Sequence, residues 1–151
     1  MLFLLFQLGE VRYALDARQI AAVLPLVGVV QIPQSPPAVA GILDYRGAPV
    51  PVIDLSQVLL GRPALRRLRT RIVVVHFPDD SGAMHLLGLI AERATETLRR
   101  EPTEFTASGV SAPHLGPVAT DERGLAQRIE VNQLLPASLR DLLFQQPVPR
   151  R

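Results

Sequence analysis

Short apolar runs, separated by glycine, proline and charged residues, set the hydrophobic pattern of this chain. Runs of about four to eight apolar or β-branched residues between turn residues are typical of β-strands. The pattern therefore predicts strands over residues 2–8, 11–15, 27–32, 72–77, 84–91 and 124–131. Residues 101–120 have no clear periodicity, and their scattered Pro, Ser, Gly and Thr predict an irregular region.

Helical features occur in three short segments. Asp16 can cap a helix over residues 17–24, which Pro25 would end, and residues 56–60 predict a helical turn ended by Gly61. Residues 131–144 are predicted to be helical because leucines supply one apolar face, namely Leu134, Leu135, Leu139, Leu142 and Leu143. The polar, proline-containing tail at 145–151 is expected to be frayed.

Residues 41–55 predict a β-hairpin that presents one arginine above an apolar surface. Two β-prone runs flank residues 45–48, and Gly47 can supply the positive φ that a tight reversal needs. Pro49 and Pro51 in the second run are of the kind tolerated on an edge strand. Arg46 is then exposed at the turn, either simply solvated or in contact with a partner.

Composition favours a small β protein over a helical bundle. At 151 residues the chain suits one domain or two small intertwined halves, and 14 prolines with 10 glycines interrupt it too often for long helices. The 48% apolar and 5% aromatic fractions place the core in Leu, Val, Ile and Ala. The absence of cysteine excludes disulfides and thiolate metal sites, in agreement with a reducing compartment.

Charge does not indicate nucleic-acid binding, although the pI is about 9.9. The net charge is only +2, and arginine supplies all 16 basic side chains. With no lysine or cysteine, little titrates between the histidines and about pH 10, so a small excess of arginine gives a high pI. A nucleic-acid surface needs a net basic face, usually with exposed aromatic residues.

The amino end and the rest of the chain predict a cytoplasmic protein without direct membrane insertion. The apolar residues 1–6 lack the positive region and the length of a signal peptide. No segment approaches the ~20 apolar residues that a membrane-spanning helix needs.

Residues 62–71 carry five arginines in ten positions. The simplest interpretation is a solvated connector. The functional alternative is an electrostatic contact with an acidic partner through Arg66, Arg67 and Arg69. Residues 67–71 also fit the Arg-x-x-x-Arg half of the PilZ cyclic-dinucleotide signature, but Met84 stands where its second half needs glycine.

No set of residues predicts catalysis, a metal or a cofactor. The three histidines, His76, His85 and His114, have no metal-ligand spacing, although His76 and His85 can face each other across a hairpin. None of the six serines lies in Gly-x-Ser-x-Gly, and no glycine-rich phosphate motif is present. Asp54 is interpreted as a hydrogen-bonded residue at a strand end rather than a general base.

The ordered set of segments resembles the CheW family, the adaptor domain of bacterial chemotaxis-type signalling arrays. Residues 44–47, Asp-Tyr-Arg-Gly, stand where the family usually has Asn-Leu-Arg-Gly, and Pro-Val-Ile-Asp-Leu at 51–55 matches closely. Four further segments are similar to the opening hairpin, the first short helix, the proline-bearing approach to the central hairpin and a later strand: 6–15, 17–24, 33–41 and 87–98. The resemblance spans about residues 3–136.

The resemblance implies a mainly β, CheW-like fold of two intertwined SH3-like five-stranded β-barrels with short helices. The domain would cover residues 1–144. One barrel would come from about 1–25 plus 95–144, and the other from about 26–94.

The resemblance also implies a non-catalytic adaptor, recruited to membrane receptor arrays. It would couple the cytoplasmic tip of a methyl-accepting chemoreceptor to the regulatory domain of a CheA-type histidine kinase. The receptor-binding residues would be Arg46, Gly47 shaping its turn, Gly41 allowing close backbone approach, and Ile20 on the first helix. The alternative function is a free-standing β-barrel that binds a small ligand such as a cyclic dinucleotide, or nucleic acid.

Several positions depart from the family pattern. Ala22 stands where an acidic residue is common, Asp44 and Tyr45 replace Asn and Leu, and residues 101–123 match poorly. The departures suggest an alternative chemosensory pathway, such as surface sensing or biofilm control. The opening residues and the hairpin look like the adaptors of Wsp-type pathways.

Overall fold

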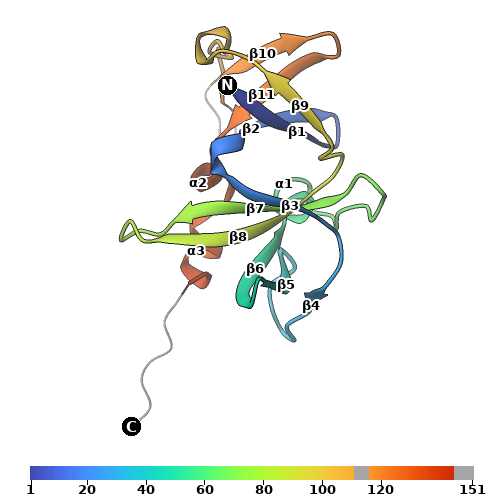
Figure 1. The fold of residues 1–151 in the computed structure, drawn as a ribbon, viewed down its shortest axis with the longest axis vertical. Helices are drawn as coiled ribbons and strands as arrows, with labels where there is room; N and C mark the ends of the chain where they lie inside the picture. The colour runs from blue at the N-terminus through green and yellow to red at the C-terminus, as the bar shows by residue number, and fades with distance from the viewer. Residues whose placement is uncertain (111–115, 145–151) are drawn as a thin grey trace.

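Two β-sheets define the architecture of the computed structural model, which describes residues 1–110 and 116–144 (Figure 1). The first sheet has five strands in the order β10-β11-β2-β1-β9. Its members come from both ends of the chain: β1 (Leu2–Leu8), β2 (Val11–Asp16), β9 (Glu96–Arg99), β10 (Val118–Asp121) and β11 (Gly124–Ile129). Because β11 pairs with β2 in parallel, the two ends of the chain are joined within one sheet.

The second sheet has six strands in the order β3-β7-β8-β6-β5-β4. All of them come from the middle of the chain: β3 (Ile20–Pro25), β4 (Val29–Val30), β5 (Val39–Tyr45), β6 (Ala48–Asp54), β7 (Arg71–Pro78) and β8 (Met84–Ala91). The architecture is therefore mainly β with two sheets, as the sequence predicted, although the second sheet has one strand more than expected.

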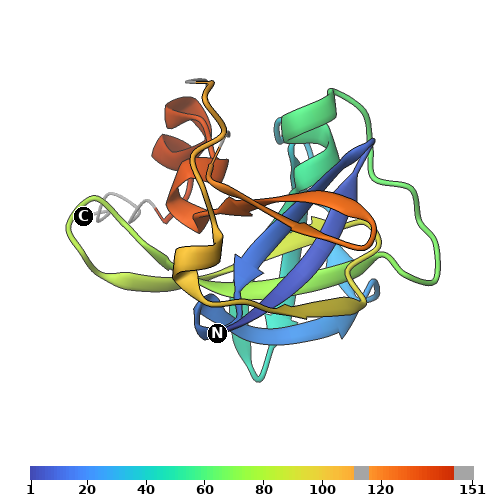
Figure 2. The same cartoon turned by 90° about the horizontal axis from the view of Figure 1, so that it is seen from above.

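Short helices connect and cover the sheets: η1 (Ala17–Gln19), α1 (Leu55–Leu60), η2 (Pro102–Glu104), α2 (Val131–Leu134) and α3 (Ala137–Leu142). Gly61 ends α1 in the left-handed conformation with φ 71°, as predicted. Figure 2 shows α1 and the C-terminal helices on one side of the molecule, with the β5–β6 turn projecting on the other.

The largest core lies in the seam between the two sheets, because strands of both contribute to one cluster. Leu4 and Leu15 from the first sheet, Val73 and Leu89 from the second, and Leu134 from α2 all pack in it. Each sheet also has a smaller core of its own. Alternate residues over Ile72–Val75 of β7 accordingly face two different cores, which explains why four consecutive residues of this strand are apolar.

The predicted helix over residues 17–24 is wrong. Asp16 does cap a turn, accepting a hydrogen bond from the Arg18 amide at 2.9 Å, but only Ala17–Gln19 is helical. Ile20–Pro25 instead forms β3, whose residues alternate between half-buried and exposed and pair with β7. The chain therefore enters the second sheet at residue 20, rather than near residue 26.

Three other boundaries also differ from the prediction. The strand expected at 27–32 shrinks to Val29–Val30, and Val118–Asp121 forms a strand in the region expected to be irregular. The C-terminal helix is interrupted at Leu135 and Pro136, because proline has no N–H to continue it and α3 begins after it. The predicted tail at 145–151 lies outside the described residues.

Candidate docking surface

The β5–β6 hairpin ends in a two-residue turn that holds Arg46 out from the sheet. Tyr45 pairs with Ala48, and the central residues Arg46 and Gly47 have φ of 53° and 83°. Positive φ at both positions is the requirement of a type I′ turn, whose twist matches the flanking strands. The Gly47 amide donates to Asp44 Oδ1 at 2.9 Å, which fixes the turn further. The prediction that Gly47 has positive φ is confirmed.

Arg46 is exposed, and its guanidinium carbon lies 5.3 Å from the centre of the Tyr45 ring. A guanidinium at this distance from an aromatic ring is attracted to it, so Tyr45 orients Arg46 without removing its donors from solvent. Asp44 and Tyr45, which sequence reasoning treated only as departures from the family pattern, thus shape the turn around Arg46.

The two prolines of β6 lie outside the segment that pairs with β8, so β8 does not require an N–H from them. Pro49 and Pro51 pair with β5, whereas the parallel pairing with β8 involves only Val52–Asp54. The expectation that β6 is an edge strand is therefore wrong for the strand as a whole and holds only for its proline-containing half.

Gly41 makes a close approach inside the protein. Its φ is 148°, and a Cβ at this position would lie 2.1 Å from the carbonyl oxygen of Val30 on β4. Gly41 is also buried. Its missing side chain therefore lets β4 pack on β5, and any influence on a partner passes through the position of the hairpin.

Ile20 is the first residue of β3, paired with Val75, and its half-buried side chain packs against the seam core. The prediction that Ile20 lies on a helix is therefore wrong. In the sheet order β7, β8 and β6 separate its strand from β5, so Ile20 and Arg46 are at two separate places on the second sheet.

Residues 62–70, called here the arginine loop, connect α1 to β7. Asp54 ties the first turn of α1 to the beginning of this loop, since its carboxylate accepts from the amides of Ser56 at 3.0 Å and Ala64 at 2.9 Å. This contact confirms the interpretation of Asp54 as a hydrogen-bonded residue at a strand end. Within the loop, the Thr70 hydroxyl donates to the Leu65 carbonyl at 2.5 Å.

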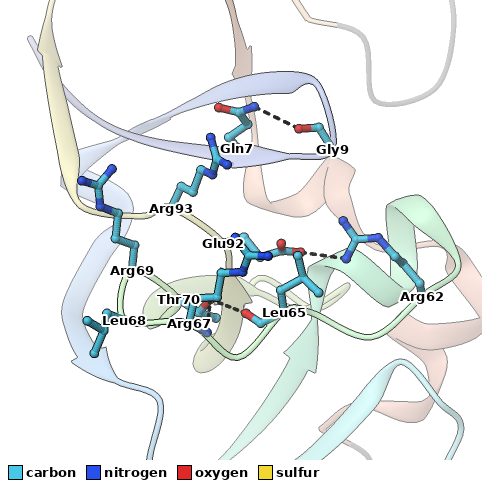
Figure 3. Close-up of a pocket in the computed structure, with 10 residues that line it drawn as sticks. All are labelled: Gln7, Gly9, Arg62, Leu65, Arg67, Leu68, Arg69, Thr70, Glu92 and Arg93. Atoms are coloured by element: carbon cyan, nitrogen blue, oxygen red, sulfur yellow. Dashed lines mark hydrogen bonds and ion pairs between the residues drawn. The ribbon is translucent and has the colours of Figure 1, made fainter.

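The three arginines grouped by the sequence do not all line one cavity. Arg67 and Arg69 line a cavity of about 560 Å³ together with Arg62 and Arg93 (Figure 3). Arg66 instead lines a different cavity beside β4 and β5. All three predicted residues are exposed. The sequence prediction did not include Arg62 or Arg93. Arg93 lies about 25 residues from Arg67 and Arg69 along the chain, and only the fold brings it near them.

A buried carboxylate lies at the floor of the larger cavity. Glu92 is 7% exposed, accepts a hydrogen bond from the Ser56 hydroxyl, and forms an ion pair with Arg62 at 3.2 Å. A buried charge needs such partners. Glu92 therefore has its partners within the fold, and we assign it a structural role rather than a ligand-binding one.

His76 and His85 do not form a site together. His85 pairs with Phe77 and His76 with Leu86, so His76 and His85 point to opposite faces and the predicted facing pair is wrong. His85 Nε2 instead lies 2.6 Å from Asp79 Oδ2. Hydrogen bonds from the Ser81 hydroxyl and from His85 lower the pKa of Asp79 to about 2. His114 lies outside the described residues.

Residues 1–110 and 116–144 offer neither a metal site nor a membrane-spanning helix. These residues contain no group of three or more His, Cys, Asp or Glu side chains placed to hold a metal ion. None of the helices in these ranges is long and apolar enough to cross a bilayer.

Comparison with known proteins identifies similar folds and sequences. A model of the CheW-like domain family matches residues 2–138. The chain is 28% identical over 103 residues to the chemotaxis protein CheW of Helicobacter pylori (strain ATCC 700392 / 26695), a match covering 68% of this chain and 59% of that protein. The crystal structure of the scaffolding protein TtCheW from Thermoanaerobacter tengcongensis is similar with a TM-score of 0.75 at 21% identity, covering 90% of this chain and 88% of that one.

Proposed function

Because this chain belongs to the CheW-like domain family, we propose that it is a scaffold coupling a methyl-accepting chemoreceptor to a CheA-type histidine kinase. The observation that carries the proposal is that the family match runs through a hairpin whose exposed Arg46 forms no ion pair or side-chain hydrogen bond with any described residue. Such a role requires binding surfaces and no chemistry, so couplings of a few kcal/mol between sites are sufficient.

The receptor-facing side of the scaffold is assigned to the hairpin and to β3. Arg46 supplies a guanidinium that can make charge-assisted hydrogen bonds to a receptor carboxylate or carbonyl. Gly47 allows the turn, Gly41 sets the position of the hairpin from inside, and Ile20 offers a half-buried apolar contact at the start of β3. The kinase's regulatory domain is assigned to a different surface, so that both partners bind at once.

The finer assignment is to an alternative chemosensory pathway that senses surfaces or controls biofilm formation. It is supported by the departures at Ala22, Asp44 and Tyr45 and by the basic arginine loop. In this scheme the protein is cytoplasmic and reaches the membrane only through its receptor.

Reconstitution tests the proposal directly. Membranes containing the receptor and the purified kinase encoded by the same cell are mixed with and without this protein and then sedimented. The kinase is expected to sediment with the membranes only when this protein is present, and its autophosphorylation should then respond to the receptor. Kinase that remains in the supernatant at saturating protein would contradict the proposal.

A further inference from the structure

The cavity beside the arginine loop has the composition of an anion-binding site (Figure 3). Its walls come from the turn after β1, the arginine loop and the segment that follows β8. We propose that this cavity binds a small phosphate-bearing ligand of nucleotide size, with Arg67, Arg69 and Arg93 as the phosphate-binding residues. The proposal concerns a different surface from the hairpin and does not depend on the receptor or the kinase.

The positive charge of the cavity is only partly compensated by acidic side chains. Arg62 forms an ion pair with Glu92, as Figure 3 shows, and the Ser56 hydroxyl donates a hydrogen bond to the same carboxylate. The side chains of Arg67, Arg69 and Arg93 form no ion pair or hydrogen bond with any other residue in the described ranges. Three guanidinium groups around one concavity therefore leave their donors available. The planar fork of such donors matches phosphate oxygens.

The backbone that presents these arginines is held by hydrogen bonds. Within the loop, the Arg67 amide donates to the Leu65 carbonyl and the Thr70 amide to the Arg67 carbonyl, both at 3.0 Å. The Ala94 amide donates to the Arg69 carbonyl at 3.0 Å, which ties the loop to the residue after Arg93. Because the backbone is already ordered, a ligand has to immobilise only the arginine side chains, which lowers the entropic cost of binding.

The size and lining of the cavity favour a nucleotide over a bare inorganic anion. A volume of about 560 Å³ lies within the ~300–1,000 Å³ of small-molecule sites. Leu65 and Leu68 add apolar surface to its lining. A base can pack on this apolar surface or stack on a guanidinium plane while its phosphates occupy the donors.

The arrangement favours a small ligand over an acidic protein segment. A segment lying along the loop would need its arginines on one face, but Arg66 lines the cavity beside Gly28 and Ala40, away from Arg67 and Arg69. Arg66 therefore also provides a matched control, because it is exposed, lies in the same loop and carries the same charge.

Isothermal titration calorimetry of the full chain with ADP, inorganic pyrophosphate and adenosine tests the proposal. ADP is expected to bind at one site, pyrophosphate more weakly and adenosine not detectably. The double variant Arg67→Gln/Arg69→Gln and the single variant Arg93→Gln should each weaken ADP binding by at least about tenfold, equivalent to ~1.4 kcal/mol. Arg66→Gln should bind ADP like the wild type, and all variants should keep the wild-type melting temperature.

Three results would overturn the proposal. The first is an absence of saturable ADP binding at millimolar concentration. The second is pyrophosphate binding as tightly as ADP, which would remove the nucleotide from the assignment. The third is equal weakening by Arg66→Gln and by the double variant, together with displacement of ADP by polyglutamate, which would make the loop a docking surface for an acidic protein.

Discussion

At the scale of single residues, the neighbours of Arg46 hold its turn in shape. Arg46 has φ 53°, a conformation that non-glycine residues rarely adopt, and the adjacent Gly47 has φ 83°, which glycine adopts without steric cost. Asp44 can replace Asn in this turn, since the turn requires only a side-chain oxygen that accepts a hydrogen bond from the Gly47 amide. Tyr45 in place of Leu adds a ring for the guanidinium that no propensity would predict.

Arg46→Ala should separate binding from folding. The side chain is exposed and lies against the Tyr45 ring, so the free energy of unfolding should change by less than ~0.5 kcal/mol. At the centre of an interface, loss of an arginine typically costs ~2 kcal/mol or more, so receptor affinity should fall about thirtyfold. Chemical denaturation and receptor co-sedimentation measure the two effects, with Arg66→Ala as the exposed control. A variant that melts much earlier and loses receptor and kinase equally would make Arg46 a structural residue.

Substitution by alanine should lower the free energy of unfolding more at Gly41 than at Gly47. Both have positive φ, but a Cβ at Gly41 would meet the Val30 carbonyl, whereas nothing lies within 4 Å of a Cβ at Gly47. Gly47→Ala should therefore cost only the backbone strain, ~1–2 kcal/mol, and Gly41→Ala clearly more, because β4 must move as well. Urea denaturation of the two variants compares them. Equal destabilisation would show that the approach of β4 to Gly41 contributes nothing.

At the scale of elements, strands bounded by turns were predictable and the segment at Ile20–Pro25 was not. Its sequence, Ile-Ala-Ala-Val-Leu-Pro, suits a helix and a strand almost equally, and pairing with β7 decides between them. The run at Ile72–Phe77 was recognisable because it begins with four consecutive apolar residues, a pattern consistent with a strand buried on both faces. At α1 the predicted end at Gly61 is confirmed, whereas the helix begins at Leu55, one residue before the predicted start, because Asp54 caps it.

Asp54→Ala should destabilise α1 and the arginine loop together. The carboxylate accepts from Ser56 and Gln57 through one oxygen and from Ala64 through the other. Loss of a helix N-cap costs ~0.5–2 kcal/mol, and the loss of the Ala64 contact should place this variant at the upper end. Asp54→Asn keeps one accepting oxygen and should fall between the variant and the wild type. Denaturation gives the free energies, and hydrogen exchange at the Ala64 amide should be faster in both variants; unchanged exchange in Asp54→Ala would contradict the anchoring role.

At the scale of the whole molecule, the two ends of the chain fold together. β11 inserts between β10 and β2, and the C-terminal helices add Leu134 and Leu139 to the seam core. The family resemblance indicated this interleaving, whereas the residues around β10 did not, because a strand of four residues has too little pattern to be recognised. Its pairing depends on β11 and on Arg12 of β2, more than 100 positions away.

The Arg12–Asp121 ion pair should make the junction of the chain ends sensitive to acid. Arg12 donates two hydrogen bonds to the Asp121 carboxylate, at 2.7 and 2.6 Å, and both side chains are mostly buried. These bonds are the main reason why the pKa of Asp121 falls from 3.8 to about 2. A carboxylate with a lowered pKa stabilises the fold above its unfolded-state value, and this contribution is lost as the pH falls through the folded-state value.

The free energy of unfolding should therefore decline as the pH falls from 3.8 toward 2, with Asp79, whose pKa is also about 2, contributing in the same window. Arg12→Gln should lower stability at neutral pH and make this decline shallower, because Asp121 then titrates closer to its ordinary pKa. Arg123→Gln is the matched control: its side chain is an exposed partner of Glu96, and its amide still donates to Asp121, so its decline should follow the wild type. Urea denaturation at a series of pH values measures all three proteins. A decline in Arg12→Gln as steep as in the wild type would show that this ion pair does not hold the two ends of the chain together.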